Sequence, residues 1–358
     1  MTALRFHTVP HRPRLYLVLL AVCVALAFPE SSRAQNADKA PTITKVSTTA
    51  AQFLKLGVGA RAVALGGSAV ASTNDLSAMY WNAAGLANIH GSSFQATYTQ
   101  YIANIDYSFA AYGTQLGGLG TVAFSMMLMN SGDMEVRTVR KPEGTSELFT
   151  AQSYALQMSF GRFLTDRFSI GGSVKFIREQ IWHSSAQAFG FDIGSQFRTP
   201  YNRLMLGASI SNFGPNMRMN GRDILFSTDP DPQNQGNVEI VNSRYETDSF
   251  PLPLVFRVGL TWEAVTNDTH TILLTTDAAH PNDNSEYVNL GAEYDFRGIF
   301  ALRGGYKNLF EVDGEQGMTF GAGLNLRIDR TLKAQFDYAY ADFGRLEQTH
   351  WFTVGLDF

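Results

Sequence analysis

The chain has 358 residues, a formal net charge of −4, 45% hydrophobic residues and only 17% charged residues. The charged fraction is well below the roughly 25% typical of soluble domains, which excludes a disordered acidic chain, and the mixed polar and apolar composition excludes a helical membrane protein. The slightly acidic charge also argues against a nucleic-acid partner.

Residues 1–34 have the order of a secretory signal peptide. Three arginines without an acid precede an apolar run over residues 15–28, and the small residues Ser32 and Ala34 follow it. This order predicts export and cleavage after Ala34. A transmembrane anchor is less favoured, because it needs about 20 apolar residues. The one cysteine, Cys23, lies in the apolar run, so the mature chain is predicted to contain no thiol.

Residues 35–91 are rich in Ala, Gly, Ser and Thr and follow neither a helical nor a strand period. Beyond Ser92 the chain changes to a period of two, most clearly over residues 254–262 and 318–328. Alternation fits both a soluble sandwich and an outer-membrane barrel. Soluble strands average about five or six residues and membrane-crossing strands about 9 to 11, so segments of about ten to twelve residues favour the barrel.

The alternating segments predict about fourteen antiparallel strands, an even number as bacterial barrels require. They lie near residues 92–101, 105–116, 119–129, 150–161, 167–180, 186–198, 203–211, 252–263, 269–279, 285–296, 299–309, 316–327, 331–341 and 347–358.

The connections between these strands alternate in length. The two longest, residues 130–149 and 212–251, both follow odd-numbered strands, whereas the connections after even-numbered strands are short. Outer-membrane barrels have short periplasmic turns and long external loops. The parity therefore predicts a barrel in the outer membrane of a Gram-negative bacterium, in contact with lipid.

Two runs of residues carry a resemblance to a known family. Gly59 to Ala69 reads GARAVALGGSA, and Asn74 to Ala87 reads NDLSAMYWNAAGLA. These runs resemble the N-terminal signature of the PorV/PorQ family, within the FadL-like outer-membrane barrels, although Ala83 stands where that family usually has Pro. Residues 277–284 and 302–306 resemble the family too.

The resemblance implies a fourteen-stranded barrel over residues 92–358 with an N-terminal plug over residues 35–91. The plug residues that match the family motif are Gly59, Arg61, Gly66, Gly67, Asp75, Tyr80, Trp81, Asn82 and Gly85. We expect Asn74, Asp75 and Asn82 to bond inward-facing cations of the wall, unless those cations are simply solvated. The candidate cations are Lys175, Arg257, Arg303, Lys307 and Arg327.

The resemblance also implies a non-enzymatic component of type IX protein secretion, which binds exported cargo or surface-complex subunits through its external loops. The candidate partner-binding loop carries Met217, Met219, Ile224, Leu225 and Phe226. Apolar side chains held outside the membrane usually mark a contact surface. They could equally pack down on the barrel rim as a lid.

The alternative function is a FadL-like transporter of hydrophobic small molecules. The apolar run over residues 126–129 breaks the alternation, so Met127 and Met129 are candidates for an apolar passage. The same residues could instead contact lipid or the plug. The sequence leaves open whether the lumen is open.

An enzyme is the least favoured class, and no cofactor or metal is expected. His183 beside Ser184 is the only adjacent pair of base and nucleophile, and neighbouring residues of a strand face opposite sides. The pairs His280 with Asp283 and Asp229 with Asp231 lack recognised metal-ligand spacing.

Overall fold

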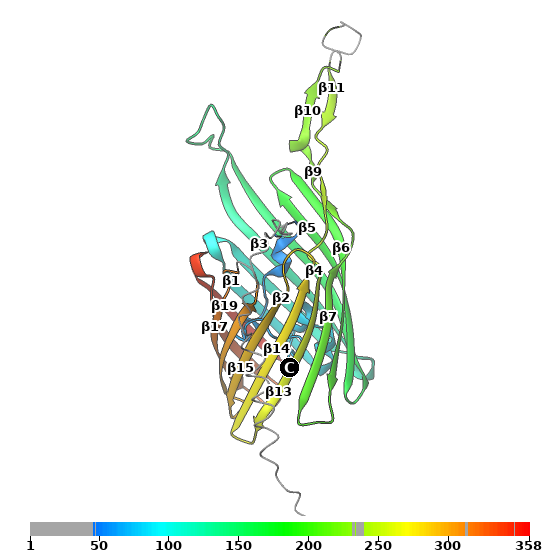
Figure 1. Cartoon of the computed structure of the whole chain (residues 1–358), viewed down its shortest axis with the longest axis vertical. Helices are drawn as coiled ribbons and strands as arrows, with labels where there is room; N and C mark the ends of the chain where they lie inside the picture. Colours follow the sequence, from blue (N-terminus) through cyan, green and yellow to red (C-terminus); the bar gives the residue numbers. More distant parts are fainter. Residues whose placement is uncertain (1–45, 47, 231–232, 234–239, 312–313, 347) are drawn as a thin grey trace, which may run out of the picture. The chain divides into compact units, whose positions relative to one another are not determined.

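The computed structural model describes residue 46, residues 48–230, residue 233 and residues 240–311, 314–346 and 348–358. The predicted signal peptide, residues 1–34, lies outside these described residues. Among them, fourteen long strands form the wall of a barrel (Figure 1). They are β1 (Ser92–Gln100), β2 (Asp106–Gln115), β3 (Thr121–Glu135), β4 (Leu148–Thr165), β5 (Phe168–Ile181), β6 (Ser184–Arg198), β7 (Leu204–Phe213), β13 (Val255–Thr266), β14 (His270–Pro281), β15 (Tyr287–Phe296), β16 (Phe300–Leu309), β17 (Met318–Arg327), β18 (Lys333–Asp342) and β19 (Gln348–Asp357).

The barrel is closed by its first and last strands. Each wall strand pairs antiparallel with its neighbours along the chain, and β1 pairs with β19 from Ser93 opposite Asp357 to Gln100 opposite His350. The backbone of Phe358 exchanges hydrogen bonds with Ser92 and completes the seam. Closure leaves no free strand edge in lipid, where unpaired backbone groups are costly. The predicted all-β, fourteen-stranded antiparallel barrel is confirmed.

Side chains on the wall alternate between the lumen and the outside. On β6, Ala188 and Asp192 face the lumen and are buried. Phe189, Phe191 and Ile193 on the same strand face outward and are exposed. A soluble sheet buries its apolar face, so an apolar outer face around a small and polar inner face is the arrangement of a membrane barrel.

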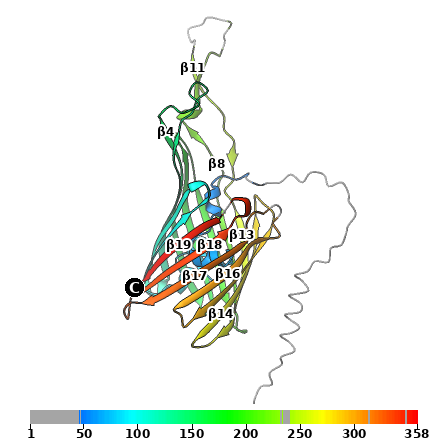
Figure 2. The same cartoon turned by 90° about the vertical axis from the view of Figure 1, so that its left-hand side faces the viewer.

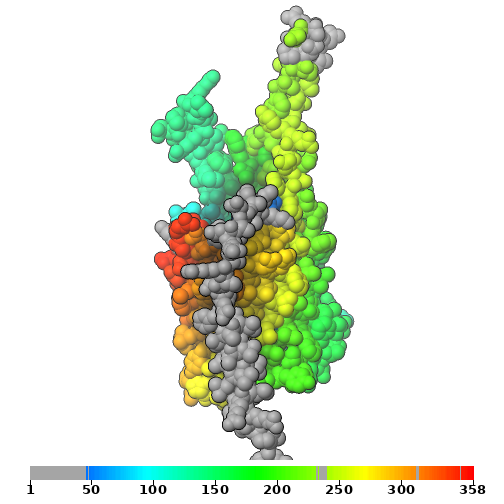
Figure 3. All heavy atoms as spheres, viewed as in Figure 1, coloured from blue at the N-terminus to red at the C-terminus, as the bar shows by residue number. Residues whose placement is uncertain are grey.

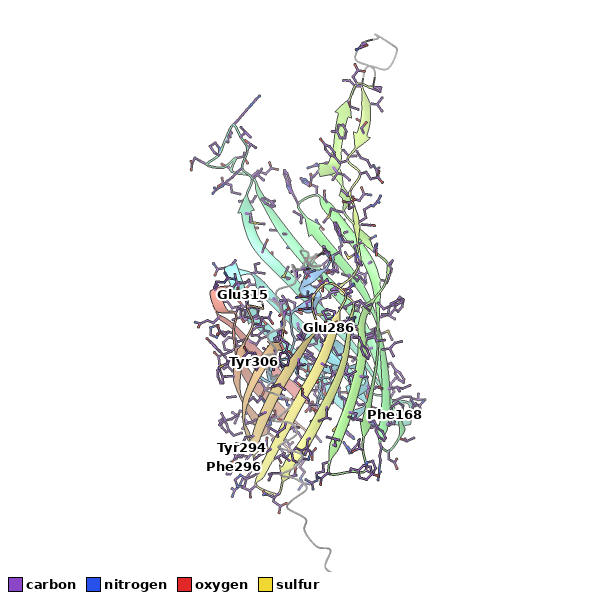
Figure 4. All side chains as sticks on the ribbon, in the orientation of Figure 1. Phe168, Glu286, Tyr294, Phe296, Tyr306 and Glu315 are labelled. Carbon is purple, nitrogen blue, oxygen red and sulfur yellow. The ribbon has the colours of Figure 1, made fainter. Side chains whose placement is uncertain are left out.

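Aromatic side chains mark both ends of this outer apolar band. Tyr154, Phe176 and Phe189 form a row on β4, β5 and β6 towards the long-loop end, with neighbouring ring centroids 6.3 and 5.5 Å apart. Tyr294 and Phe296 lie towards the short-turn end, as Figure 4 shows. Aromatic rings at these two levels suit the two membrane–water interfaces.

The wall is taller on one side than on the other. Strands β3, β4, β5 and β6 have 15, 18, 14 and 15 residues, whereas β1 has 9 and β2 has 10. The extra length continues β3 and β4 beyond the rim at the end that carries the long loops (Figure 1). Short 3-10 turns lie in three of the connections, η3 (Ile102–Asn104), η4 (Gly117–Leu119) and η6 (Gly344–Leu346).

The connection from β7 to β13 contains structure of its own. It holds β8 (Met217–Arg218), β9 (Asn220–Gly221), η5 (Arg222–Ile224), β10 (Leu225–Thr228), β11 (Val241–Arg244) and β12 (Ser249–Phe250). We call its described residues 218–230, 233 and 240–250 the arm. Strands β10 and β11 pair only with each other among the described residues. Figure 3 shows this ribbon standing out beyond the barrel mouth.

Residues 48–91 lie within the barrel (Figure 2). They form only short helical pieces, η1 (Gln52–Lys55), α2 (Ala60–Ala64), α3 (Ala78–Trp81) and η2 (Ala83–Asn88). No helix among the described residues has the length and apolar character needed to span a membrane. We call residues 48–91 the plug segment.

Candidate functional site

The plug segment runs through the lumen from one end of the barrel to the other. At the long-loop end the Thr49 hydroxyl donates to Asp283 at 2.7 Å, and the Ala50 amide donates to the Pro251 carbonyl at 2.9 Å. Farther along, the Asn82 amide donates to the Ser195 carbonyl at 2.9 Å, close to the short-turn end of β6. The plug segment therefore begins near the long-loop end and reaches the start of β1 at the short-turn end.

Glycines of the wall allow the plug backbone to lie directly against it. A Cβ atom added at Gly207 or Gly291 would come within 2.5 Å of the Val70 carbonyl oxygen or 2.6 Å of the Leu65 carbonyl oxygen, respectively. Wall glycines Gly161 and Gly321 face the plug at similar distances. A side chain at these positions would collide with the plug, so plug and wall are in direct backbone contact here.

Of the four glycines of the plug motif, Gly66 lies closest to the wall, whereas Gly59 and Gly85 have their nearest contacts within the plug. Gly66 has a φ angle of +68°, and a Cβ atom there would lie 2.6 Å from the Leu290 carbonyl oxygen. Only glycine adopts this conformation without strain and leaves this space. Gly59 precedes α2, Gly67 accepts a hydrogen bond from Asn289, and Gly85 packs against the Thr73 carbonyl.

Side chains of the wall supply hydrogen-bond partners to the irregular backbone of the plug. Asp277 accepts hydrogen bonds from the amides of Ala69 and Val70 at 2.8 and 2.9 Å. Gln157 donates to the Met79 carbonyl at 2.7 Å. Buried backbone groups outside regular structure need such partners, and supplying them from the wall holds the plug in one position.

Arg61 of the plug joins a buried charge network. Its guanidinium donates to both carboxylate oxygens of Glu293, at 2.9 and 3.0 Å. Arg303 bonds the same carboxylate at 2.6 Å and Asp337 at 2.5 Å. Two cations and two anions thus neutralise one another in a largely buried network, and the plug supplies one of the four.

The predicted pairing of Asn74, Asp75 and Asn82 with wall cations is wrong. Asn74 accepts from Arg61 at 3.1 Å and Asp75 from the Ser77 amide at 2.9 Å, both within the plug. Asn82 bonds backbone groups instead of charges. These short polar side chains end close to their own backbone, so local partners replace the cations across the lumen.

Three of the candidate wall cations have other partners, Arg303 in the network above and Lys175 and Arg257 elsewhere. Lys175 pairs with Asp192 at 2.8 Å. The Arg257 guanidinium lies 6.0 and 5.7 Å from the ring centroids of Tyr80 and Trp81, which are motif residues of the plug. Cation–π contacts of this kind stabilise the buried charge and the rings together.

The candidate apolar passage is filled. Met127 has 0% exposure and packs with Phe53 and Leu54 of the plug in one apolar cluster, and Met129 packs against that cluster. The run is continuously apolar because both faces of β3 are apolar here, with Met126 facing outward at 43% exposure and Met127 facing inward. The side chains of Met127 and Met129 pack against the plug at this point.

The candidate partner-binding loop divides into two parts. Met217 is 1% exposed and Met219 is half-buried, and both join the apolar cluster below the mouth, so their prediction as an external contact surface is wrong. Ile224 is half-buried at the start of the arm. Leu225 and Phe226 lie on the projecting ribbon with 51% and 36% exposure. Only this second part faces water.

The sequence analysis missed the partner strand of this ribbon. Phe226 stacks on Tyr245 with ring centroids 4.5 Å apart, and the exposed Ile240 and Val241 extend the apolar surface. The sequence between Leu225-Phe226 and Ile240-Val241 is rich in Pro, Asp, Asn and Gln, which is typical of a hairpin loop. This pattern could have predicted the second strand.

The base of the arm is held on the barrel. Strand β9 pairs with the start of β6, and Asp223 accepts hydrogen bonds from the His183 ring at 3.0 Å and from Ser184 at 3.2 Å. Desolvation opposes ionisation of Asp223, but these bonds hold the pKa of its carboxyl below the usual range. His183 and Ser184 both contact Asp223, which ties the arm to the β5–β6 turn.

Comparisons with known proteins decide the family. The family model for the type IX secretion system protein PorV matches residues 38–225. The chain belongs to the PorV family. It is an integral outer-membrane protein, and its family is a secretion component and not an enzyme family. No protein of curated function matches the chain.

Solved structures with the same fold are FadL-like barrels. The chain is similar to the toluene transporter TodX of Pseudomonas putida, with 13% identity, a TM-score of 0.51, and 84% of this chain and 96% of that chain covered. It is similar to the CymD monoaromatic hydrocarbon channel, with 12% identity, a TM-score of 0.52, and coverage of 84% and 96%. At this identity the likeness shows that PorV-family members and these channels share a fold.

Proposed function

We propose that this PorV-family barrel is a non-enzymatic component of type IX protein secretion that binds exported cargo or surface-complex subunits through its arm. The residues before the barrel serve as a cleaved signal peptide (1–34) and a plug (35–91). The observation that carries the proposal is the contrast between a filled lumen and an exposed apolar ribbon on a fixed base.

The exposed ribbon is built to meet another molecule. Leu225, Phe226, Val241 and Tyr245 present apolar surface to water at a distance from the barrel rim. Stacked aromatic rings on a rigid support lose little conformational entropy on binding, and aromatic residues are enriched at interaction hot spots. A protein partner outside the membrane is the ligand that fits such a surface.

The test is a pull-down of the detergent-extracted protein from its own outer membrane, followed by mass spectrometry. The variant Phe226→Ala/Tyr245→Ala removes the aromatic stack but keeps Met217 and the mouth. We expect recovery of exported or surface-complex proteins to fall at least about 10-fold, as loss of a hot spot of about 1.4–2 kcal/mol predicts. Val139→Ala, on the exposed β3–β4 loop, is the matched control and should leave recovery unchanged. Equal recovery with both variants would overturn the proposal.

The second candidate is a transporter of hydrophobic small molecules. The apolar cluster at the mouth and the shared fold with monoaromatic hydrocarbon channels favour it. Transport would require the plug to move away from the wall. Uptake of radiolabelled toluene by vesicles containing the purified protein, compared with empty vesicles, separates this candidate from the first.

A further inference from the structure

An open recess of about 320 Å³ lies on the outer wall near the long-loop end of β13, β14 and β15. Phe256, Val258, Ala278, Val288 and Phe310 line it. Its volume is at the lower end of the roughly 300–1,000 Å³ of small-ligand pockets. It is therefore large enough for part of an amphiphile.

The strand register creates the recess. Ala278 lies between Val258 on β13 and Val288 on β15, and all three face outward in one row. The methyl group of Ala278 makes this the low point of the row. Phe256 bounds the recess on the β13 side.

A register shift forms the other boundary. Pairing of β15 with β16 jumps from Val288 opposite Leu309 to Leu290 opposite Tyr306. Phe310 follows directly with a φ angle of +73° and is 64% exposed. Such irregularities re-aim side chains at a barrel rim, and here Phe310 is turned over the recess.

The recess has a polar group at one end only. His280 and Glu286 lie at its loop end, and the His280 ring hydrogen-bonds the Glu286 carboxylate at 2.9 Å. Figure 4 shows Glu286 towards the long-loop end of the barrel. Of the remaining lining, Phe256, Val258, Ala278 and Val288 face outward in the lipid-facing band, and Ala279 and Tyr287 occupy inward-facing positions of β14 and β15. The outward side of the recess opens into the membrane.

We propose that this recess binds one acyl chain of an outer-leaflet lipid, with the lipid headgroup beside His280 and Glu286. An apolar trough that opens into lipid and ends at polar groups matches an amphiphile aligned with the membrane normal. The outward rows of the barrel elsewhere contact lipid as well, but the row Val258–Ala278–Val288 offers a hollow that holds one chain in place.

The test uses the full mature protein in nanodiscs of phosphatidylethanolamine containing a small fraction of the same lipid with a diazirine on its acyl chain. After photolysis, crosslinked peptides are mapped by mass spectrometry. We expect crosslinks to concentrate several-fold on β13, β14 and β15 relative to the other wall strands. Ala278→Trp fills the recess and should reduce this excess to the level of the other strands.

Ala110→Trp is the matched control, because Ala110 is an outward-facing alanine of β2 and lies away from the recess. It should leave the pattern unchanged. Val258→Phe is a second filling variant if Ala278→Trp prevents folding, since Val258 is already exposed. An even distribution of crosslinks around the barrel, or an excess that survives both filling variants, would overturn the proposal. So would crosslinks from Phe310→benzoylphenylalanine in native membranes that capture protein instead of lipid.

Discussion

The plug segment and the arm are both irregular stretches of chain that are not part of the barrel wall. The plug is buried and hydrogen-bonded to the wall, whereas the arm is exposed to water. The plug is rich in small residues, and wall groups such as Asp277 and Gln157 bond its backbone. The arm has a fixed base but presents Leu225 and Phe226 to water. Buried irregular backbone must find partners, whereas exposed apolar groups persist where another molecule covers them. The inside of this barrel is thus packed against its plug, and the proposed binding surface lies outside.

The largest effect is expected from a side chain that separates plug and wall. A Cβ atom at Gly171 would overlap the Ala83 carbonyl, whereas one at the neighbouring Gly172 would lie 3.5 Å from its nearest contact. We expect Gly171→Leu to prevent stable seating of the plug and Gly172→Ala to be tolerated. Channel conductance in planar bilayers should rise above the wild-type level for the first variant only. Equal conductance would show that the lumen does not depend on this contact.

The next effect tests the charge network of the plug. Glu293→Gln leaves Arg61 and Arg303 without their shared carboxylate, and loss of one partner of a buried pair costs about 3–5 kcal/mol. The exposed pair of Arg203 with Glu263, at 4.0 Å, is the control. Glu263→Gln should cost less than about 1 kcal/mol. Urea unfolding in lipid vesicles measures both, and similar costs would contradict a structural role of the network.

Substitutions in the arm should change the stability of the barrel very little. Phe226→Ala/Tyr245→Ala removes exposed rings and leaves the barrel intact, so the free energy of unfolding should change by less than about 0.5 kcal/mol. The same variant is expected to lose its protein partners. A large loss of stability would show that the ribbon stabilises the barrel, as the plug does, and would contradict this prediction.

The smallest effect is expected at the outer anchor of the plug, where Asp283 bonds Thr49, Gln52 and Lys55. Desolvation opposes ionisation of Asp283, but hydrogen bonds from Gln52 and Thr49 and the charge of Lys55 hold the pKa of its carboxyl below the usual range. A depressed pKa in the folded state stabilises the anchor above the unfolded-state pKa of about 3.9, and this stabilisation is lost as the pH falls through the folded-state pKa.

Hydrogen exchange at the amides of residues 50–55 should therefore be constant relative to the intrinsic rate from pH 8 to about pH 5 and should accelerate below about pH 4. Asp283→Asn should remove this pH dependence. Glu286→Gln, in the same loop but paired with His280, should keep it. An unchanged profile in Asp283→Asn would assign the anchor to other contacts.

The sequence by itself determined the barrel. Alternation over about ten residues, an even number of strands and the parity of loop lengths are local properties, because side-chain direction along a strand has a period of two. The family motif likewise identified Arg61, Gly66 and Asn82 as plug residues. The sequence could not predict the partners of these residues. Glu293 is more than two hundred residues from Arg61, and every other inward-facing acid was an equal candidate.

Only the tertiary structure decided which apolar residues of the long connection are buried. Met217 and Phe226 lie nine positions apart in similar sequence surroundings, yet one joins the cluster below the mouth and the other faces water. The difference arises because Met217 packs in the apolar cluster and β9 pairs with β6 of the wall, while β10 and β11 pair only with each other among the described residues. Burial depends on what the folded barrel places nearby, and no local pattern encodes that.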